Sequence, residues 1–317
     1  MKGLVKPLLK DNETEGDGYY VTCKSCKYFH YSHDKAAFVA RFGDLGAATT
    51  ECPNCRDPIE GRRKRMYLRP RMFFYDAPEN ASHEQSPPRA SLIAGTMASY
   101  VPELVDAAIT PVARAFEARL VPNASVFFAN QGRSPRGFRF ERDRRYVVNV
   151  SEKAEAPRGF YADLAFILKT DVYELCESMQ GGLLSAWLSD PVRGPSIRTA
   201  LHLGTAIALE VDTRDVGIDI LARADRRKSL TFFDTAPGGS GTVRQLFEDP
   251  TKLKAVIHAA LTVVRSCRCR ESTACYDCLL RFDNQQDHAD LSRGAALDSL
   301  NFLDEALGRS ADASSVD

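Results

Sequence analysis

Nine cysteines carry the clearest chemistry in this 317-residue chain, and eight of them fall into two groups of four. The first group joins Cys23-x2-Cys26 to Cys52-x2-Cys55, with twenty-five residues between the two pairs. Two short Cys-x2-Cys turns at such a spacing are typical of a zinc ribbon, in which four thiolates hold one ion tetrahedrally. Thiolates are soft donors that suit zinc, and amides of each short turn donate hydrogen bonds to the sulfurs. We therefore predict a zinc site here.

The second group is tighter, because Cys267-x-Cys269 is followed after five residues by Cys275-x2-Cys278. Four cysteines so close in sequence cannot avoid one another, and we expect them to hold a second zinc ion. A four-cysteine iron–sulfur cluster is an alternative, since its ligand set is the same. In either case all ligands are protein sulfurs, which leaves no open position for water or substrate. Both metals are therefore predicted to be structural rather than catalytic.

Disulfides are the alternative interpretation of the first group, but a cytoplasmic chain keeps such thiols reduced. The ninth cysteine, Cys176, lies in an apolar run and is expected to be a buried free thiol. Near the first group, His30 and His33 are interpreted as surface residues or supports of the ligands, because four cysteines already complete that site. On an apolar helix, His202 is expected to be a hydrogen-bonded core residue.

The overall composition is that of an ordinary folded protein. Hydrophobic residues make up 44% and charged residues 26%, which argues against a disordered tail or a membrane protein. The first twenty residues turn acidic by Asp11, so neither a signal peptide nor a membrane span is predicted. We expect a cytoplasmic protein with no membrane partner.

Charge is balanced overall but uneven along the chain. Forty-two basic side chains oppose forty-two acidic ones, so the whole molecule is not a general anion binder. Residues 61–75 and 133–145, however, each hold six basic residues interleaved with aromatic ones, a composition suited to phosphate neutralisation and base stacking. A solvated strand face is the other interpretation. The candidate nucleic-acid contacts are Arg62, Arg63, Lys64, Arg65, Arg133, Arg136 and Arg139.

The patterns predict an α+β fold, in which an N-terminal zinc ribbon precedes a mixed α/β domain that carries the C-terminal four-cysteine site. We place the ribbon domain with its basic segment at 1–75 and the α+β domain at 91–317. The proline- and serine-rich residues 76–90 would be the linker. Helices are expected at 33–41, 90–120 with breaks at Pro102 and Pro111, 197–211, 242–265, and 290–307 with Asp290 as its cap. Strands are expected from Ser125, Gly137, Tyr146, Ala162, Asp215 and Lys228.

Three stretches in the last third resemble the MZB-type zinc-binding module. They are FFDTAPGGSG at 232–241, CRCRESTACYDCLLRFDNQQDH at 267–288 and LSRGAALDSL at 291–300. They contain an aspartate before Pro-Gly-Gly-x-Gly and the four cysteines in this order, followed by Asn284, His288 and Arg293. FILKTDVYEL and YLRPRMFFYD extend a weaker similarity upstream. This module occurs at the C-termini of many bacterial DEAD/DEAH-box helicases and in the B subunit of the DISARM phage-defence system.

The resemblance implies a helicase-associated role in DNA repair or phage defence, with DNA and a DEAD/DEAH-box helicase subunit as partners. The sequence contains no Gly-x4-Gly-Lys-Ser/Thr loop and no DEAD or DEAH box. We therefore expect the ATPase in another chain or in a missing segment. The chain would then be a non-catalytic accessory protein.

Two other functions stay open at this point. One is a free-standing DNA-binding zinc protein without a helicase partner. The other is a metal-dependent nuclease built from Asp234, Asp283, His288 and Asp290, which would require these side chains to converge on an open metal site. The turn PGGSG has two interpretations as well. Its amides would either cradle a phosphate at a helix start or simply form a turn that glycine permits.

Overall fold

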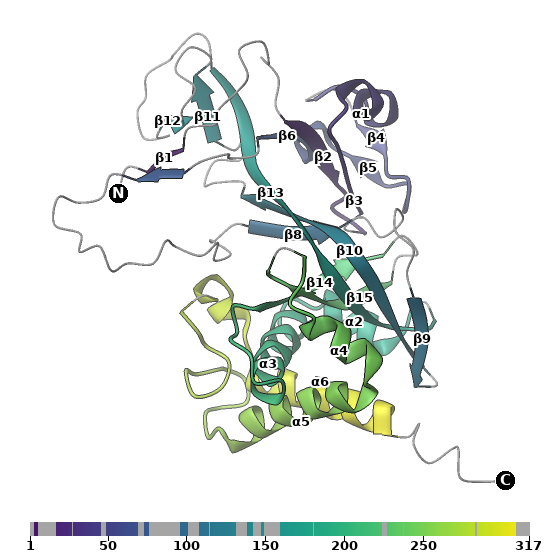
Figure 1. Ribbon diagram of the computed structural model, residues 1–317, viewed down its shortest axis with the longest axis vertical. Coiled ribbons are helices and arrows are strands. Elements are labelled where there is room, and N and C mark those ends of the chain that lie inside the picture. Colours follow the sequence, from purple (N-terminus) through teal and green to yellow (C-terminus); the bar gives the residue numbers. More distant parts are fainter. Residues whose placement is uncertain are drawn as a thin grey trace. The chain divides into compact units, whose positions relative to one another are not determined.

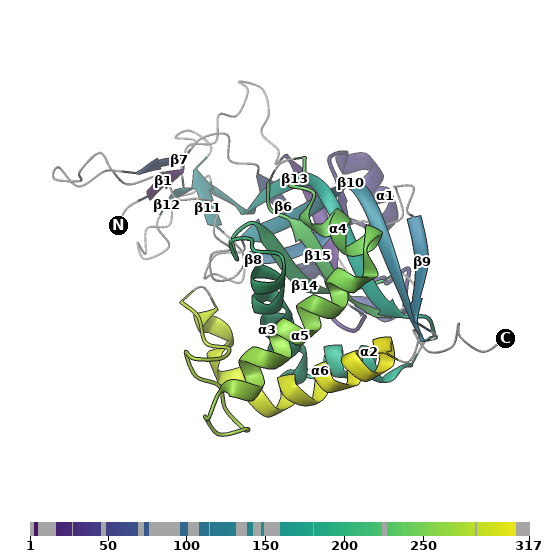
Figure 2. The same cartoon turned by 60° about the horizontal axis from the view of Figure 1, so that its bottom comes forward.

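The computed structural model divides into two compact units, which are described separately (Figures 1 and 2). Unit 1 consists of Met1–Tyr100 and Val126–Ile167, and unit 2 of Val101–Ser125 and Leu168–Asp317. The predicted boundary at residue 75 and the 91–317 domain stay predictions, and the predicted linker 76–90 lies outside the described residues. The described residues are 3–5, 17–26, 28–45, 49–68, 73–75, 96–100, 108–113, 115–130, 138–141, 147–148, 159–179, 181–223, 227–236, 238–282 and 284–308.

Unit 1 is built on strands, with one helix beside the first cysteine group. A sheet runs in the order β12-β11-β13-β6-β2-β3, and β6 pairs parallel to β13 while its pairing with β2 is antiparallel. The described strands are β1 (Gly3–Val5), β2 (Gly18–Thr22), β3 (Phe29–Ser32), β4 (Thr50–Glu51), β5 (Pro58–Ile59), β6 (Lys64–Leu68), β7 (Phe73–Tyr75), β8 (Thr96–Tyr100), β11 (Phe138–Glu141), β12 (Val147–Val148) and the first half of β13 (Gly159–Glu177). Helix α1 (Lys35–Phe42) begins at Asp34, whose carboxylate accepts the amides of Ala36 and Ala37.

Aromatic rings hold the sheet of unit 1 together. Phe127, near the end of β10 (Phe116–Asn130), lies 5.0–5.3 Å by ring centroid from four others: Tyr20, Phe29, Tyr31 and Tyr67. Such ring pairs stabilise beyond the area they bury, by about 0.5–1.5 kcal/mol each. A smaller cluster around Phe38 and Phe42 lies under the first cysteine group.

Unit 2 places helices against a short sheet. Strand β15 (Lys228–Asp234) lies between β14 (Val216–Ala222) and the second half of β13, all antiparallel, and β9 (Ala108–Ala113) pairs with β10. The helices are α2 (Leu183–Ser189), α3 (Arg193–Ala208), α4 (Thr242–Glu248), α5 (Pro250–Ser266), the 3-10 helix η3 (Gln285–Asp290) and α6 (Arg293–Gly308). Both views show α3, α5 and α6 packed together beside β14 and β15 (Figures 1 and 2).

Side-chain alternation in the strands decides which sheet face of unit 2 receives the helices. Tyr173 and Leu175 alternate with Glu174 and Cys176 along β13, and they lie in one buried cluster with Phe232 and with residues of the helices. Successive side chains of a strand point to opposite faces. The apolar set therefore binds the helices, whereas Glu174 and Cys176 belong to the other face.

The prediction of a helix over 90–120 is wrong where the structure describes this segment. Residues 96–100, 108–113 and 116 onward form β8, β9 and β10. From Phe116 to Leu120 burial alternates, with Glu117 and Arg119 the more exposed residues, which is a period of two. Pro111 is tolerated because β9 pairs with β10 alone among the described strands, so no second ladder needs its missing N–H.

Two helix boundaries also differ from their predictions. The expected helix 242–265 is split at Asp249, whose carboxylate accepts the Thr251 amide, and Pro250 starts α5. Proline cannot donate within a continuing helix and is well placed at the first helical position. The last helix begins at Arg293, and Ser292 rather than Asp290 caps it, because its hydroxyl accepts the Ala295 amide at 3.2 Å. The other predicted helices and strands are found, and the α+β fold class is confirmed.

Candidate metal centres and nucleic-acid surfaces

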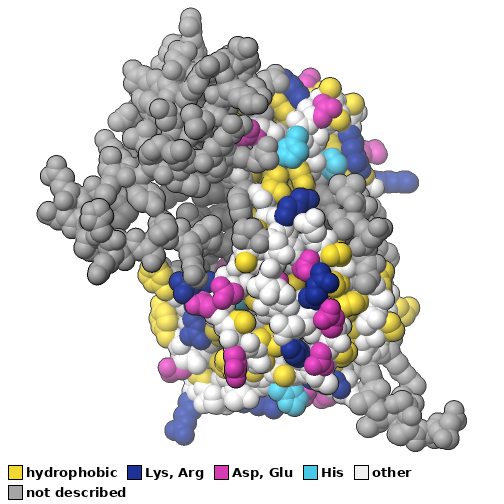
Figure 3. Space-filling view, in the orientation of Figure 1, with side chains coloured by type: hydrophobic (Ala, Val, Ile, Leu, Met, Phe, Trp, Pro, Cys, Tyr) yellow, Lys and Arg dark blue, Asp and Glu magenta, His cyan; other side chains and the backbone are white. Residues whose placement is uncertain are grey.

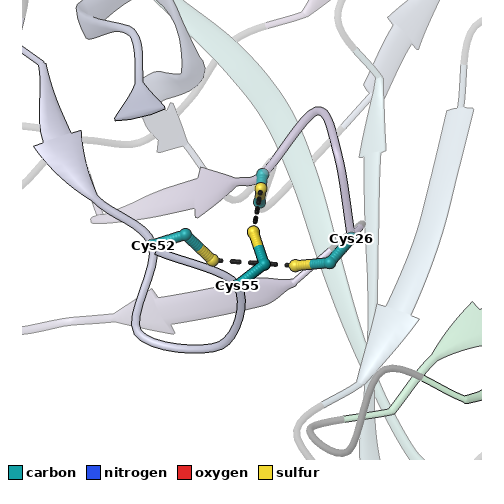
Figure 4. Close-up of side chains that lie close together, drawn as sticks. Cys26, Cys52 and Cys55 are labelled. Atoms are coloured by element: carbon teal, nitrogen blue, oxygen red, sulfur yellow. Dashed lines mark hydrogen bonds between the residues drawn. The ribbon is translucent and has the colours of Figure 1, made fainter. Parts of the chain in front are cut away.

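The first cysteine group forms where two tight turns of unit 1 face each other. Cys23 and Cys26 follow β2, and Cys52 and Cys55 lie between β4 and β5. The Cys23 and Cys55 sulfurs are 3.6 Å apart, as are those of Cys26 and Cys52, and all four sulfurs lie within 4.8 Å of one another. Figure 4 shows the Cys26, Cys52 and Cys55 side chains directed toward a common point.

Backbone hydrogen bonds set the shape of each turn before any metal binds. The Cys23 amide donates to Tyr28 O, and the Cys52 amide donates to Asp57 O. Arg56 takes a left-handed conformation (φ 62°) as its amide returns to Cys52 O. Burial raises the pKa of the Cys52 thiol although the amides of Cys55 and Asn54 favour its thiolate. At Cys23, burial opposes ionisation, but hydrogen bonds from the Cys26 and Ser25 amides prevail and the pKa is lowered.

The second cysteine group begins directly at the end of α5. The sulfurs of Cys267 and Cys275 are 3.3 Å apart, those of Cys269 and Cys278 3.8 Å, and those of Cys275 and Cys278 3.9 Å. A turn brings the Leu279 and Leu280 amides to Cys275 O, at 3.1 and 3.0 Å. A hydrogen bond from the Cys269 amide lowers the pKa of Cys267 to about 7, whereas burial raises the pKa of Cys278 to about 12.

The donor geometry of both groups fits zinc. With Zn–S bonds of about 2.3 Å, a tetrahedral site places its sulfurs about 3.8 Å apart, close to the separations found. A disulfide would need about 2.05 Å, and all nine cysteines are free, so the disulfide interpretation is excluded. Four thiolates at one point repel one another and lose hydration unless a cation compensates. Each group can therefore hold one structural zinc ion, with cysteine sulfurs in all four positions.

Three residues that follow the second cysteine group, and that form part of the resemblance to the MZB module, support the loop of that group. The Arg293 guanidinium donates to Cys269 O (3.1 Å) and to Val264 O (3.2 Å), so it ties the loop to the end of α5. The Asn284 amide side chain accepts the Arg281 N–H and donates to Leu279 O. His288 Nε2 lies 2.9 Å from Arg281 O. These side chains act on the backbone of the loop rather than as ligands.

Asp234 explains the PGGSG turn. Its buried carboxylate accepts the amides of Ser240 and Gly241, both at 2.9 Å, and of Val243 at 3.2 Å. Gly238, Gly239 and Gly241 all have φ near +83°, which other residues rarely adopt. These amides already bind a carboxylate, so the interpretation as a turn holds and the phosphate cradle does not. Among the described residues, the only sets of three or more candidate ligand side chains are the two cysteine groups.

The first basic segment is divided between surface and interior. Arg62 is exposed and pairs with Glu60, and this pairing lowers the pKa of the Glu60 carboxyl with smaller effects from Lys24 and Arg63. Lys64 is buried, at 4% exposure. Arg65 forms a two-pronged ion pair with Asp163, which is buried and also accepts the Tyr20 hydroxyl at 2.6 Å. Among the described residues of this segment, the arginines that stay at the surface without a buried ion pair are thus the exposed Arg62 and the half-buried Arg63.

The second basic segment is described only in part. Arg139 lies in β11, where it pairs in register with Tyr161 of β13, and Arg133 and Arg136 lie outside the described residues. Contact of either segment with DNA stays a prediction.

The remaining singled-out residues have structural roles. His33 Nδ1 lies 2.9 Å from the Tyr67 hydroxyl, and His30 packs against Phe42. His202 is part-buried, with Nε2 at 2.7 and 2.8 Å from two backbone carbonyls, Thr213 O and Val216 O. Cys176 is fully buried, and burial raises its pKa to about 12.

A buried ionic network that no sequence pattern predicts surrounds Cys176 on the sheet face opposite the helices of unit 2. Arg223 Nη1 lies 3.2 Å from the Cys176 sulfur and 3.5 Å from Glu174 Oε2. Arg227 pairs with Glu117 at 2.9 Å. These residues are far apart in sequence, so no spacing predicts their meeting.

Residues 197–279 match the MZB family model, described as the MrfA Zn-binding domain. The match covers α3 through the second cysteine group. No curated protein sequence matches the chain.

Two similar solved structures are "Crystal Structure of DUF1998 helicase MrfA bound to DNA" (14% identity, TM-score 0.43) and "Crystal Structure of DUF1998 helicase MrfA bound to DNA and AMPPNP" (12% identity, TM-score 0.29). They cover 66% and 89% of this chain. The chain spans only 24% and 30% of those helicase chains. Within the described residues, no helix has both the length and the apolar character needed to cross a membrane.

Proposed function

We propose that this chain is a non-catalytic zinc-binding accessory protein of a DEAD/DEAH-box DNA helicase. It would act in phage defence, as a DISARM-type subunit, or in DNA repair, and would work in the cytoplasm. The observation that carries the proposal is the MZB match over 197–279 together with a four-cysteine site whose ligands are all protein sulfurs. A closed metal site has no position for substrate, so the module contributes shape and surface rather than chemistry.

The DNA-contacting part of the proposal concerns unit 1. Arg62 and Arg63 follow directly after β5, next to the ribbon turns, and Lys24 lies close enough to act on Glu60. Guanidinium and ammonium groups at a surface neutralise phosphates without reading sequence. We therefore assign this patch to backbone contact with DNA.

The two alternative functions make different predictions. A free-standing DNA-binding zinc protein would bind DNA equally well with and without a helicase. A nuclease would need carboxylates around an open metal site, whereas Asp234 is engaged by three amides and His288 contacts the loop backbone. The structural roles of these two residues favour the accessory function.

Co-purification tests the proposal directly. This chain, carrying an affinity tag, is co-expressed with each DEAD/DEAH-box helicase of the same genome in turn, and a helicase of the same class from an unrelated genome serves as the control. We expect a complex of defined stoichiometry with one of these helicases and none with the control. Recovery of the chain alone, with full DNA binding, would favour the free-standing protein. Cleavage of DNA that depends on a divalent metal would establish the nuclease.

A further inference from the structure

Two aromatic rings project into solvent from the loop that holds the second cysteine group. Phe282 is 86% exposed, more than any other large hydrophobic side chain among the described residues, and Tyr276 is 61% exposed. Tyr276 lies between two ligands, Cys275 and Cys278. Hydrophobic, basic and acidic side chains are interspersed over the face of unit 2 in view (Figure 3). A zinc loop does not need exposed rings to hold its metal, so their placement requires another explanation.

The loop presents these rings in a fixed geometry. Asn284 brackets the turn that carries Phe282, since it accepts the Arg281 amide at 2.8 Å and donates to Leu279 O at 2.9 Å. The Tyr276 ring stands edge-on to the His288 ring, with centroids 5.7 Å apart. Because neighbouring groups already hold the backbone in place, a ligand that stacks on these rings does not have to order the loop.

Guanidinium groups accompany the rings. Arg268 and Arg270 flank Cys269 with exposed side chains, and no described acidic residue pairs with either. Arg281 donates to Tyr276 O at 3.2 Å, which places its charge beside that ring. Four thiolates around one zinc ion leave about two formal negative charges, which these arginines offset. The loop is therefore not strongly basic, and any attraction that it exerts on nucleic acid must rely mainly on its rings.

The size of this surface decides which class of partner it fits. A stable protein interface buries about 800 Å² on each partner, more than two rings and a few guanidiniums on one short loop provide. A nucleobase needs only one exposed ring to stack on, and base stacking tolerates any sequence. We propose that this loop contacts single-stranded nucleic acid, with Phe282 and Tyr276 stacking on bases and with Arg268 and Arg270 beside the phosphates. The inference rests on the proposed function, because it names the strand that this module would hold.

Binding of a fluorescein-labelled oligo(dT) of about 20 nucleotides, long enough for one site, tests the inference by fluorescence anisotropy. Phe282→Ala and Tyr276→Ala should each weaken binding about tenfold, and the double variant should lose still more, since each removes one stacking platform. Phe282→Trp should bind within about twofold of wild type because it restores a ring. The control Met179→Ala, a change at another exposed apolar residue of unit 2, should leave affinity unchanged. An oligo(rU) of equal length shows whether DNA or RNA is preferred.

Elemental analysis should find two zinc ions per chain in every variant, which separates stacking from loss of the fold. Wild-type affinity of the double variant, or no binding of oligo(dT) by the wild-type protein, would overturn the inference. So would a double variant that binds oligo(dT) normally but no longer co-purifies with the helicase, since the rings would then contact protein. If the helicase complex forms with both rings replaced and only strand binding is lost, the inference holds. Co-purification itself does not depend on stacking, so the two proposals fail separately.

Discussion

The ribbon cysteines of unit 1 come from two chain segments, whereas the C-terminal cysteines of unit 2 all lie within the twelve residues that follow α5. Their surroundings differ even more. The buried cluster at the ribbon consists of a few side chains from short strands and α1, and it includes the ligands Cys23 and Cys52. The C-terminal cysteines border a far larger cluster to which α3, α5, α6 and the sheet all contribute.

Core size, rather than the length of the closed loop, should decide how much each metal matters for folding. Cys26 and Cys52 are 26 positions apart, and Cys269 and Cys275 are 6 apart. Loop-closure entropy grows only logarithmically, so this difference amounts to about 1 kcal/mol. A structural zinc site contributes about 10 kcal/mol or more of apparent folding free energy. The buried cluster at the ribbon turns is small and includes two of the ligands, so it can replace little of that contribution, while the helices of unit 2 keep their own contacts.

The largest effect is expected when one cysteine ligand is removed from each site. This change tests whether core size decides how much each metal contributes to folding. Cys52→Ser should remove one zinc ion and expose the amides of residues 17–68 to hydrogen exchange. Cys278→Ser should remove the other ion, yet increase exchange mainly over residues 267–292, because α3, α5 and α6 retain their own contacts. Hydrogen-exchange mass spectrometry with zinc analysis measures both. If hydrogen exchange increased equally widely in both units, core size would not matter. The control is Cys176→Ser, which changes a buried thiol that is not a ligand.

An intermediate effect is expected at the buried ion pair of unit 1. Arg65→Ala removes the ion-pair partner of the Asp163 carboxylate, which stays buried and still accepts the Tyr20 hydroxyl. Removing one partner of a buried pair costs about 3–5 kcal/mol. Arg62→Ala, at an exposed pair, should cost less than about 1 kcal/mol. Urea unfolding followed by fluorescence compares the two, and equal midpoints would mean that Arg65 is a surface residue in solution.

The smallest effect is expected on DNA affinity, where variants of the two units should differ in their salt dependence. Replacing Arg62 and Arg63 together by alanine should weaken DNA binding alike for all sequences and flatten its salt dependence by roughly one unit of slope per lost phosphate contact. The ring variants of the C-terminal loop should instead lower affinity at every salt concentration with little change of slope, since stacking involves no counterions. Arg133 and Arg136, replaced together, provide the comparison set on the second basic segment. Unchanged slopes in both sets would assign the basic runs to solvent or to a partner protein.

Local chemistry made several features of this protein predictable. Short Cys-x-Cys and Cys-x2-Cys spacings limit the distance between the two sulfurs of each pair. Eight cysteines were therefore enough to predict both four-cysteine groups. Likewise, the strand-like run at 162–175 and the helical period in 197–211 predicted β13 and α3. The resemblance to the MZB module rested on the four C-terminal cysteines and on Asp234, Asn284, His288 and Arg293.

Tertiary structure decided the features that depend on meetings between distant residues. The pairing of Arg65 with Asp163, 98 positions away, removed that arginine from the surface, although the composition of its segment matched that of a DNA-binding segment. Residues 96–100, 108–113 and 116–120 became strands because β8 and β9 each pair with β10, and these backbone ladders outweighed a weak helical pattern. The exposure of Phe282 could not be predicted from the sequence either, since an aromatic residue after an apolar run normally continues the core. A sequence lists the donors, charges and rings, but burial and pairing are set by the whole fold, because each requires a partner from elsewhere in the chain.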